Sequence, residues 1–319
     1  MPNILIVRLS SMGDVINAMP AVTDMARALP GLQLDWVVEE SFQSLPRLHP
    51  AVAQVIPVAL RRWRKAPFSA QTWREFSAAR AALQAKPYDL ILDVQGLLKS
   101  VFFARMANGP IAGPDRSSAR EALASFAYQY SYPVVWQQHA IQRVRKLSAA
   151  ALAYPLPDKI DYGLPRPKVE LPWLKPQPYV VLLTATSRPE KEWPEPHWIA
   201  LGTRFAERGL ACVLPWGSAP ERERAERLAA VIPGAQAAPK MALDAAAALL
   251  ADARVVVGVD TGLAHLAAAM ATPVVAVFLA SDPEQNGVLA STYAVNVGHD
   301  GASPDVEAVW QAATSGMRS

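Results

Sequence analysis

The chain passes repeatedly from a short apolar run, through a turn of small or polar residues, into a helical pattern. Residues 4–7 lead into Ser10-Ser11-Met12-Gly13-Asp14, and residues 255–259 lead into Asp260-Thr261-Gly262. Short apolar runs of this kind are typical of parallel strands that are buried on both faces. Because these strands alternate with helices, the sequence predicts an α/β fold with parallel sheets and right-handed crossovers.

The pattern divides into two parts. In the first, we expect strands at 3–7, 33–38, 55–57 and 90–93 and helices at 14–29, 71–85, 98–107, 119–130 and 140–152. After the proline-rich stretch 154–178, we expect strands at 179–183, 210–214, 255–259 and 274–278 and helices at 197–208, 221–231, 243–251 and 264–270. We predict Rossmann-like domains at 1–158 and 179–319, a linker at 159–178 and a central cleft. Packing of the last helix on the first domain stays open.

Composition limits the class of protein. The chain has 319 residues, of which 51% are hydrophobic, so it is long enough for two globular domains. Cys212 is the only cysteine, which excludes an intrachain disulfide and a cysteine zinc cluster. No apolar run approaches the roughly 20 residues that span a bilayer, and the first residues do not resemble a signal peptide. We expect a cytoplasmic protein without a transmembrane segment.

Charge is distributed unevenly along the chain. Residues 1–150 carry 17 Lys and Arg against 10 Asp and Glu, a balance of +7, whereas the remaining residues carry 14 against 18, a balance of −4. The run Arg61-Arg62-Trp63-Arg64-Lys65 places four cations on one short loop. Such a run can be a solvated patch, a nucleic-acid contact or a site for a compact anion. The net charge of only +3 argues against nucleic acid, and Arg suits phosphate and carboxylate.

Polar residues follow the strands of the first part. Asp14 stands at the start of a helix, either as a cap on the helix dipole or as a functional carboxylate. Gln95 and Lys99 follow the strand at 90–93, where a ligand site and a plain turn both fit. His139 and Arg143 lie at the start of another helix, where we favour a cap.

The second part shows the same arrangement. Thr186 and Ser187 can donate to phosphate oxygens, and Lys191 can neutralise charge. The turn Asp260-Thr261-Gly262 can hold a phosphate at a helix start, with His265 near sugar hydroxyls, although a simple helix cap also explains it. Glu221 could bind ribose hydroxyls, and the backbone near Met241 could read a base edge.

Several of these segments together carry a resemblance to a known family. They are residues 10–14, 36–40, 61–65, 93–100, 191–194, 214–217 and 259–266. In this order and spacing, the chain resembles the ADP-heptose:lipopolysaccharide heptosyltransferases, which have the GT-B glycosyltransferase fold. The basic run 61–65 looks most like the members that add the first heptose. Residues 278–283 depart from the family, whose members tend to carry a Gly-Pro-Thr-like turn there.

The resemblance implies an enzyme that moves L-glycero-D-manno-heptose from ADP-heptose to the first Kdo of Kdo–lipid A, with inversion. Asp14 would be the general base, and Lys191 would stabilise the departing ADP. The implied donor-binding residues are Thr186, Ser187, Lys191, Glu221, Met241, Asp260, Thr261, Gly262 and His265. The implied acceptor-binding residues are Ser10, Ser11, Gly13, Arg61, Arg62, Arg64, Lys65, Gln95, Lys99, Arg120, His139 and Arg143.

Other features of the implied enzyme follow from the same likeness. Because the sequence has no Asp-x-Asp pair, we expect no metal requirement, and we expect no cofactor. The lipid acceptor implies work at the cytoplasmic face of the inner membrane, with peripheral attachment left open. The alternatives are an enzyme that adds the second heptose, a nucleotide-sugar epimerase of similar shape and a non-catalytic nucleotide-binding protein.

Overall fold

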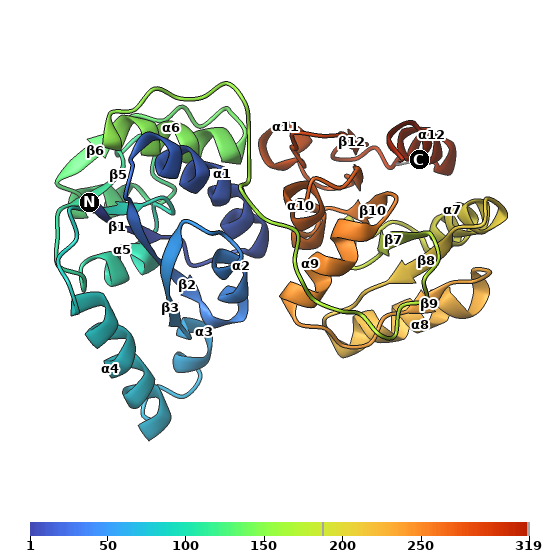
Figure 1. The fold of residues 1–319 in the computed structure, drawn as a ribbon, viewed down its shortest axis with the longest axis horizontal. Helices are drawn as coiled ribbons and strands as arrows, with labels where there is room; N and C mark the ends of the chain where they lie inside the picture. Colours follow the sequence, from blue (N-terminus) through green and yellow to red (C-terminus); the bar gives the residue numbers. More distant parts are fainter. Residues whose placement is uncertain (187, 318–319) are drawn as a thin grey trace. The chain divides into compact units, whose positions relative to one another are not determined.

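The computed structural model describes residues 1–186 and 188–317 (Figure 1). The chain forms two compact units, Met1–Leu164 and Pro165–Ser319. The boundary between them falls inside the stretch expected to be a linker. Within the described residues, each unit contains a six-stranded sheet in which every strand pair is parallel. The prediction of two parallel α/β sheets is therefore confirmed.

The sheet of the first unit has the order β3-β2-β1-β4-β5-β6. Its strands are β1 (Asn3–Val7), β2 (Gln33–Glu39), β3 (Val52–Val58), β4 (Leu90–Asp93), β5 (Ile111–Pro114) and β6 (Tyr130–Tyr132). At the centre, Ile6 is in register with Trp36 on β2 and with Leu92 on β4. The carboxyl ends of β1, β2 and β4 therefore lie next to one another, and ligands of open parallel sheets bind at such ends.

Helices cover both faces of this sheet (Figure 1). Helix α1 (Met12–Ala28) packs against α6 (Ala140–Leu152), and α2 (Ser44–Arg47) packs against α1 and β3. The other face carries α3 (Leu60–Trp63), α4 (Ala70–Gln84) and α5 (Leu98–Ala104), whose Trp63, Leu83 and Phe103 share a core with Leu5 and Val7 of β1. Helices on both faces of the sheet explain why its central strands are buried on both sides.

The sheet of the second unit has the order β12-β11-β10-β7-β8-β9. Its strands are β7 (Tyr179–Leu183), β8 (Ala211–Leu214), β9 (Gln236–Ala237), β10 (Val256–Val259), β11 (Val274–Val277) and β12 (Ala294–Val297). Its helices are η3 (Pro189–Lys191, a 3-10 turn), α7 (Glu195–Glu207), α8 (Ala219–Val231), α9 (Leu243–Asp252), α10 (Gly262–Ala269), α11 (Pro283–Asn286) and α12 (Val306–Gly316). Val309 and Ala313 place α12 in the same core as Trp198 and Phe205 of α7, so the last helix belongs to the second unit.

The segment 119–130 differs from its prediction as a helix. It forms a short 3-10 helix, η2 (Ala122–Ala127), and then enters β6. The Gln129 backbone N–H donates to the Ile111 carbonyl at 2.9 Å, and the Gln129 side chain accepts from the Ile111 N–H at 2.8 Å. Pairing with β5 therefore ends the helix. Among the described residues, no helix is both long and apolar enough to cross a membrane.

Candidate active site

Asp14 caps the first helix of the chain and carries an ion pair. It is the third residue of α1, and its Oδ2 accepts from the Ser11 backbone N–H at 2.8 Å and from the Ser11 hydroxyl at 3.0 Å. The Arg8 guanidinium lies 2.6 Å from Oδ1, and Arg8 also donates to the Val94 carbonyl at 2.6 Å. The ends of β1 and β4 thus fix one carboxylate at the start of α1.

The charge of Asp14 is set by competing effects. Burial acts to raise the pKa of Asp14, but the Arg8 cation and the two hydrogen bonds from Ser11 outweigh it and hold that pKa below its usual value. The carboxylate is therefore ionised at neutral pH. An ionised carboxylate at a strand end can accept a proton from a bound hydroxyl group.

The turn after β4 joins the turn after β1. Gln95 accepts from the Leu9 N–H at 2.7 Å and donates to the Ser10 carbonyl at 3.2 Å, and its side chain is buried. Lys99 Nζ donates to the Ser10 hydroxyl at 3.0 Å. Gly96 has φ +66°, a conformation that favours glycine, and this shapes the turn. Gln95 therefore joins two loops, whereas Lys99 brings an exposed cation to the site.

Besides Arg8, two cations, Lys99 and Arg143, interact electrostatically with Asp14, and each of them also interacts with Arg120. Burial and nearby Arg61 lower the pKa of Lys99, with Arg120 acting in the same direction and Asp14 opposing it. Burial also lowers the pKa of Arg143, with Arg8 and Arg120 adding to the effect and Asp14 again opposing it. We call these cations the basic rim: Arg61, Lys99, Arg120 and Arg143. Such a rim suits a ligand with several negative charges.

Arg143 and His139 come from the start of α6. Arg143 donates to the carbonyls of Trp136 at 3.1 Å and Gln138 at 2.9 Å, and its guanidinium lies 4.3 Å from the Trp136 ring centroid. His139 caps α6, because its Nδ1 accepts from the Ile141 N–H at 3.2 Å. The capping interpretation therefore fits His139, while Arg143 is held close enough to interact with Asp14.

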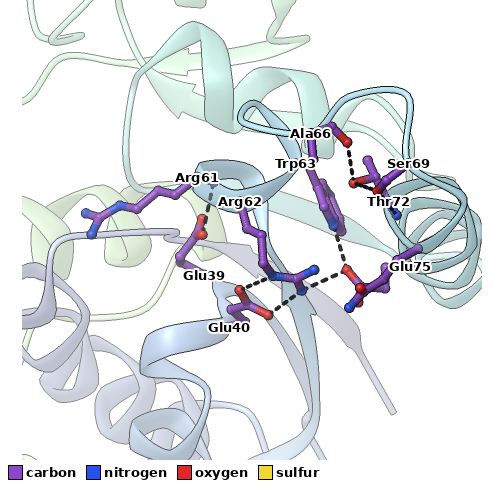
Figure 2. Close-up of polar contacts among 10 residues, drawn as sticks. Glu39, Glu40, Arg61, Arg62, Trp63, Ala66, Ser69, Thr72 and Glu75 are labelled. Atoms are coloured by element: carbon purple, nitrogen blue, oxygen red, sulfur yellow. Dashed lines mark hydrogen bonds and ion pairs between the residues drawn. The ribbon is translucent and has the colours of Figure 1, made fainter.

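The basic run 61–65 separates into two environments (Figure 2). Arg62 forms a bidentate pair with Glu40, at 3.0 and 2.8 Å, and contacts Glu75 at 2.8 Å. The Arg61 side chain points away from this cluster in Figure 2, while its backbone N–H donates to Glu39 at 3.2 Å. Arg64 and Lys65 are exposed.

Arg62 therefore has a structural role in the first unit, and its expected contact with the acceptor stays a prediction. Its guanidinium already pairs with two carboxylates, and Glu75 also accepts from the buried Trp63 indole at 2.8 Å. These contacts hold α3 against α4. The other cations of the run, which include Arg61, keep side chains that a ligand can reach.

In the second unit, three neighbouring strand ends meet at Asp260. Lys191, from η3 after β7, forms an ion pair with Asp260 Oδ2. The Ser281 hydroxyl, beyond β11, donates to the same oxygen at 2.8 Å, and the Thr186 hydroxyl donates to the Asp260 carbonyl at 2.9 Å. Sequence reasoning missed Ser281, because the turn 278–283 departs from the family pattern. A hydroxyl two residues before the start of α11 was the available signal.

The other expected donor residues lie at helix starts. Thr261 precedes α10, Gly262 is its first residue, and His265 is buried in its second turn. Glu221 caps α8 by accepting from the N–H groups of Gly217 at 2.7 Å and Ser218 at 3.3 Å. Met241 is half-buried just before α9, and Ser187 lies outside the described residues.

A hollow in the second unit is lined by the sequence neighbours of Glu221 and Met241 but by neither residue itself. A cavity of about 610 Å³ is lined by residues from the ends of β8 and β9 and from α8, including Trp216, Arg222 and Lys240. The Trp216 indole donates to the Ala238 carbonyl at 2.6 Å, which fixes the ring. Across the part of the chain that is described, no three His, Cys, Asp or Glu side chains gather as metal ligands would. The absence of a metal requirement stays a prediction.

Two residues around Asp14 were also missed from sequence. Arg8 follows β1 directly, and its signal was a cation at the end of a buried strand. Glu39 ends β2, is buried, and has a pKa that burial raises against the opposing effect of the Arg61 N–H. The Glu39 N–H donates to the Leu9 carbonyl at 3.1 Å, which places Glu39 beside the turn that leads to Asp14.

Known proteins share this architecture. The model of glycosyltransferase family 9 (heptosyltransferase) matches residues 76–313. Lipopolysaccharide heptosyltransferase 1 from Pseudomonas aeruginosa is 49% identical over 300 residues, which cover 93% of this chain and 84% of that protein. Lipopolysaccharide heptosyltransferase 2 from Escherichia coli (strain K12) is 33% identical over 102 residues, which cover 30% of this chain and 29% of that protein.

Solved structures agree over nearly the whole length. The structure of E. coli heptosyltransferase WaaC with ADP has a TM-score of 0.88 at 42% identity and covers 97% of this chain and 98% of that one. The WaaC structure with ADP-2-deoxy-2-fluoro heptose has a TM-score of 0.85 at the same identity and coverage. The two sheets with their strand-end sites thus define a glycosyltransferase of the GT-B fold. The chain belongs to glycosyltransferase family 9, the heptosyltransferase family.

Proposed function

We propose that the chain transfers L-glycero-D-manno-heptose from ADP-heptose to the first Kdo of Kdo–lipid A, with inversion at the anomeric carbon. The observation that carries this proposal is the ionised Asp14, which interacts with Lys99 and Arg143 of the basic rim, in a chain so similar to heptosyltransferase 1 proteins. Membership in a glycosyltransferase family sets aside the epimerase and the non-catalytic binding protein.

In the proposed reaction, the acceptor hydroxyl oxygen attacks the anomeric carbon of the heptose. A new C–O bond forms, the C–O bond to the diphosphate breaks, and the hydroxyl proton passes to Asp14. Arg8 favours this role because it keeps Asp14 ionised before the reaction. The basic rim suits the carboxylates of Kdo and the phosphates of lipid A, since Arg can bind each in bidentate fashion.

The second unit would bind the donor. Negative charge develops on the departing ADP, and Lys191 with the N–H groups at the start of α10 can stabilise it. The ion pair with Asp260 and the hydrogen bond from Ser281 hold this part of the site together, so we assign Asp260 and Ser281 to positioning Lys191. We propose that the reaction needs no metal and no cofactor, because Lys191 and the helix start supply positive charge.

The choice of the first heptose rests on the extent of similarity. The heptosyltransferase 1 relative matches 93% of this chain, whereas the heptosyltransferase 2 relative matches 30%. The test is an acceptor panel: Kdo–lipid A and the same lipid already carrying one heptose, each incubated with ADP-heptose. We expect ADP release only with Kdo–lipid A. Release only with the heptose-bearing lipid would replace this proposal with the second-heptose activity.

The lipid acceptor also determines where the enzyme works. Kdo–lipid A is anchored in a bilayer by its acyl chains, so the acceptor sugar lies at the membrane surface. We propose that the chain associates peripherally with the cytoplasmic face of the inner membrane. The positive balance of residues 1–150 fits this location, because membrane surfaces that carry anionic lipid attract cations.

A further inference from the structure

Several large apolar side chains of the first unit are exposed on α4, α5, η2 and the loop before α4. Phe68 is 89% exposed, Trp73 60% and Phe126 71%. We call the following group the apolar patch: Phe68, Trp73, Leu98, Phe102, Leu123 and Phe126. Among residues 1–186 and 188–317, the second unit contributes only Val231 to the large apolar side chains that are exposed. The exposure is therefore a property of the first unit and not of the whole surface.

The apolar patch lies on three neighbouring elements, α4, α5 and η2. The Trp73 ring lies 6.3 Å from the Phe76 ring, and Phe76 stacks on Phe102 at 6.2 Å, which joins α4 to α5. Helix η2, which carries Leu123 and Phe126, packs on α5. Contiguous exposed apolar surface of this kind usually marks an interaction site.

The apolar patch borders the candidate active site. Leu98 opens α5 and precedes Lys99, whose Nζ donates to the Ser10 hydroxyl at 3.0 Å. The Leu98 N–H donates to Glu121 at 2.6 Å, and the Glu121 N–H donates to the Gly96 carbonyl at 3.0 Å. The start of η2 is thus tied to the turn after β4, so a surface that docks on the apolar patch would lie next to the basic rim.

Unpaired positive charge accompanies the apolar patch. The segments that carry it, residues 64–76, 98–105 and 116–126, hold seven exposed cations: Arg64, Lys65, Arg74, Lys99, Arg105, Arg116 and Arg120. Arg116 lies 5.9 Å from the Phe126 ring centroid. The carboxylates of the same segments are engaged within the unit, Glu75 by Arg62 and Trp63, and Glu121 by the Leu98 N–H. The surface therefore combines aromatic rings with a net positive charge.

We propose that the apolar patch docks this chain on an anionic lipid bilayer. Aromatic and aliphatic side chains enter the boundary between headgroups and acyl chains, while flanking cations bind anionic headgroups. A second copy of this chain fits less well, because it would bring these seven cations close to the same seven cations of the other copy. This inference rests on the proposed function. Docking would place Asp14 near the membrane level at which a lipid-anchored Kdo presents its hydroxyl groups.

Vesicle flotation with the full chain, without donor or acceptor, tests the docking. We expect binding to vesicles that contain phosphatidylglycerol and little binding to pure phosphatidylcholine. Each cation near the surface contributes about a fivefold change in partitioning, so added salt should release the protein. The double variant Phe68→Ser, Trp73→Ser should bind at least about tenfold more weakly, because full burial of one such side chain is worth that factor or more. The matched control Val231→Ser should bind like the wild type.

Three outcomes would overturn the inference. They are equal binding to both vesicle types, unchanged binding of the Phe68→Ser, Trp73→Ser variant, and a change in oligomeric state as that variant's only defect. Activity on a deacylated, water-soluble Kdo acceptor separates this question from the proposed function. The double variant should match the wild type on that acceptor and lose activity on acceptor embedded in vesicles. A wild type that binds vesicles but is inactive on both acceptors would contradict the proposed function and leave the docking intact.

Discussion

Asp14 has two separable roles, and the substitution Asp14→Asn distinguishes them. The asparagine side chain has the same shape and keeps an oxygen that can accept from the Ser11 N–H. It removes the negative charge, and with it the ion pair to Arg8 and the capacity to take a proton. A helix cap needs chiefly the oxygen, whereas a general base needs the charge.

The two roles differ in expected magnitude. Loss of the charge near the helix start and of a partly buried ion pair should cost about 1–3 kcal/mol of unfolding free energy. A unit of this size loses about 2–4 °C of Tm for each kcal/mol, so the folded state should survive at 25 °C. Loss of a general base should lower kcat by about 10²–10⁴-fold, which is roughly 2.7–5.5 kcal/mol of activation free energy. A pure cap predicts nearly unchanged kcat in the folded variant.

The assay is ADP release as a function of pH, with circular dichroism as the check of folding. Arg8 and Ser11 hold the pKa of Asp14 below its usual value, so wild-type kcat/KM should stay high down to acidic pH and then fall as Asp14 is protonated. Because the pKa of Asp14 is lower in the folded chain than in the unfolded chain, the ionised carboxylate stabilises the fold above the unfolded pKa. This stabilisation is lost as pH falls through the folded pKa. Asp14→Asn should lack this acid limb. A folded variant with near-normal kcat would refute the assignment and return Asp14 to a capping role.

Three further predictions concern other side chains of the two units. Lys191→Ala should lower kcat more than it raises the KM for ADP-heptose, because it removes charge stabilisation of departing ADP; steady-state kinetics checks this, and a pure KM effect would contradict it. Arg61→Ala should raise the acceptor KM with little change in Tm. Arg62→Ala should lower Tm, because it breaks the contacts to Glu40 and Glu75. The opposite result, a lower Tm for Arg61→Ala and a raised acceptor KM alone for Arg62→Ala, would contradict the two environments assigned to these side chains. His49, which follows α2, is buried and lies 2.9 Å from the Thr23 hydroxyl, and burial lowers its pKa to about 4. As pH falls, the unfolded chain therefore binds a proton at His49 before the folded chain does, and the free energy of unfolding should fall by about 3 kcal/mol between pH 6.5 and 4. Denaturant titration of the wild type and His49→Gln measures this, and equal pH dependence of the two would contradict it.

The sequence predicted most of the strands that are buried on both faces. Residues 3–7, 90–93 and 179–183 form strands with the expected bounds, because a buried parallel strand must be apolar throughout. Four strands were missed: β6, β9 and β12 are short and not fully buried, and β5 is buried but contains a glycine and a proline that obscure the strand pattern. The helix expected at 119–130 failed because its end pairs with β5, a contact distant in sequence that local pattern does not report.

The sequence predicted which kinds of side chain lie in the candidate site, but it did not predict which side chains contact one another. Placement of Asp14 and Asp260 at strand ends follows from local sequence alone. The pairing of Arg62 could not be predicted, because four adjacent cations look alike in sequence and only Glu40 and Glu75, which other elements supply, distinguish one of them. Arg8 and Ser281 were missed for the same reason: each acts through a carboxylate that a different strand supplies.

The central claim is heptose transfer to the first Kdo, and the mass of the lipid acceptor tests it most directly. Purified chain would be incubated with ADP-heptose and Kdo–lipid A, and the lipid would be analysed by mass spectrometry beside samples that lack the donor or contain Asp14→Asn. We predict that the lipid gains the mass of one heptose residue and no second one, with one ADP released for each sugar added. ADP release without any mass gain on the lipid would contradict the account, because the donor would then be hydrolysed and not transferred.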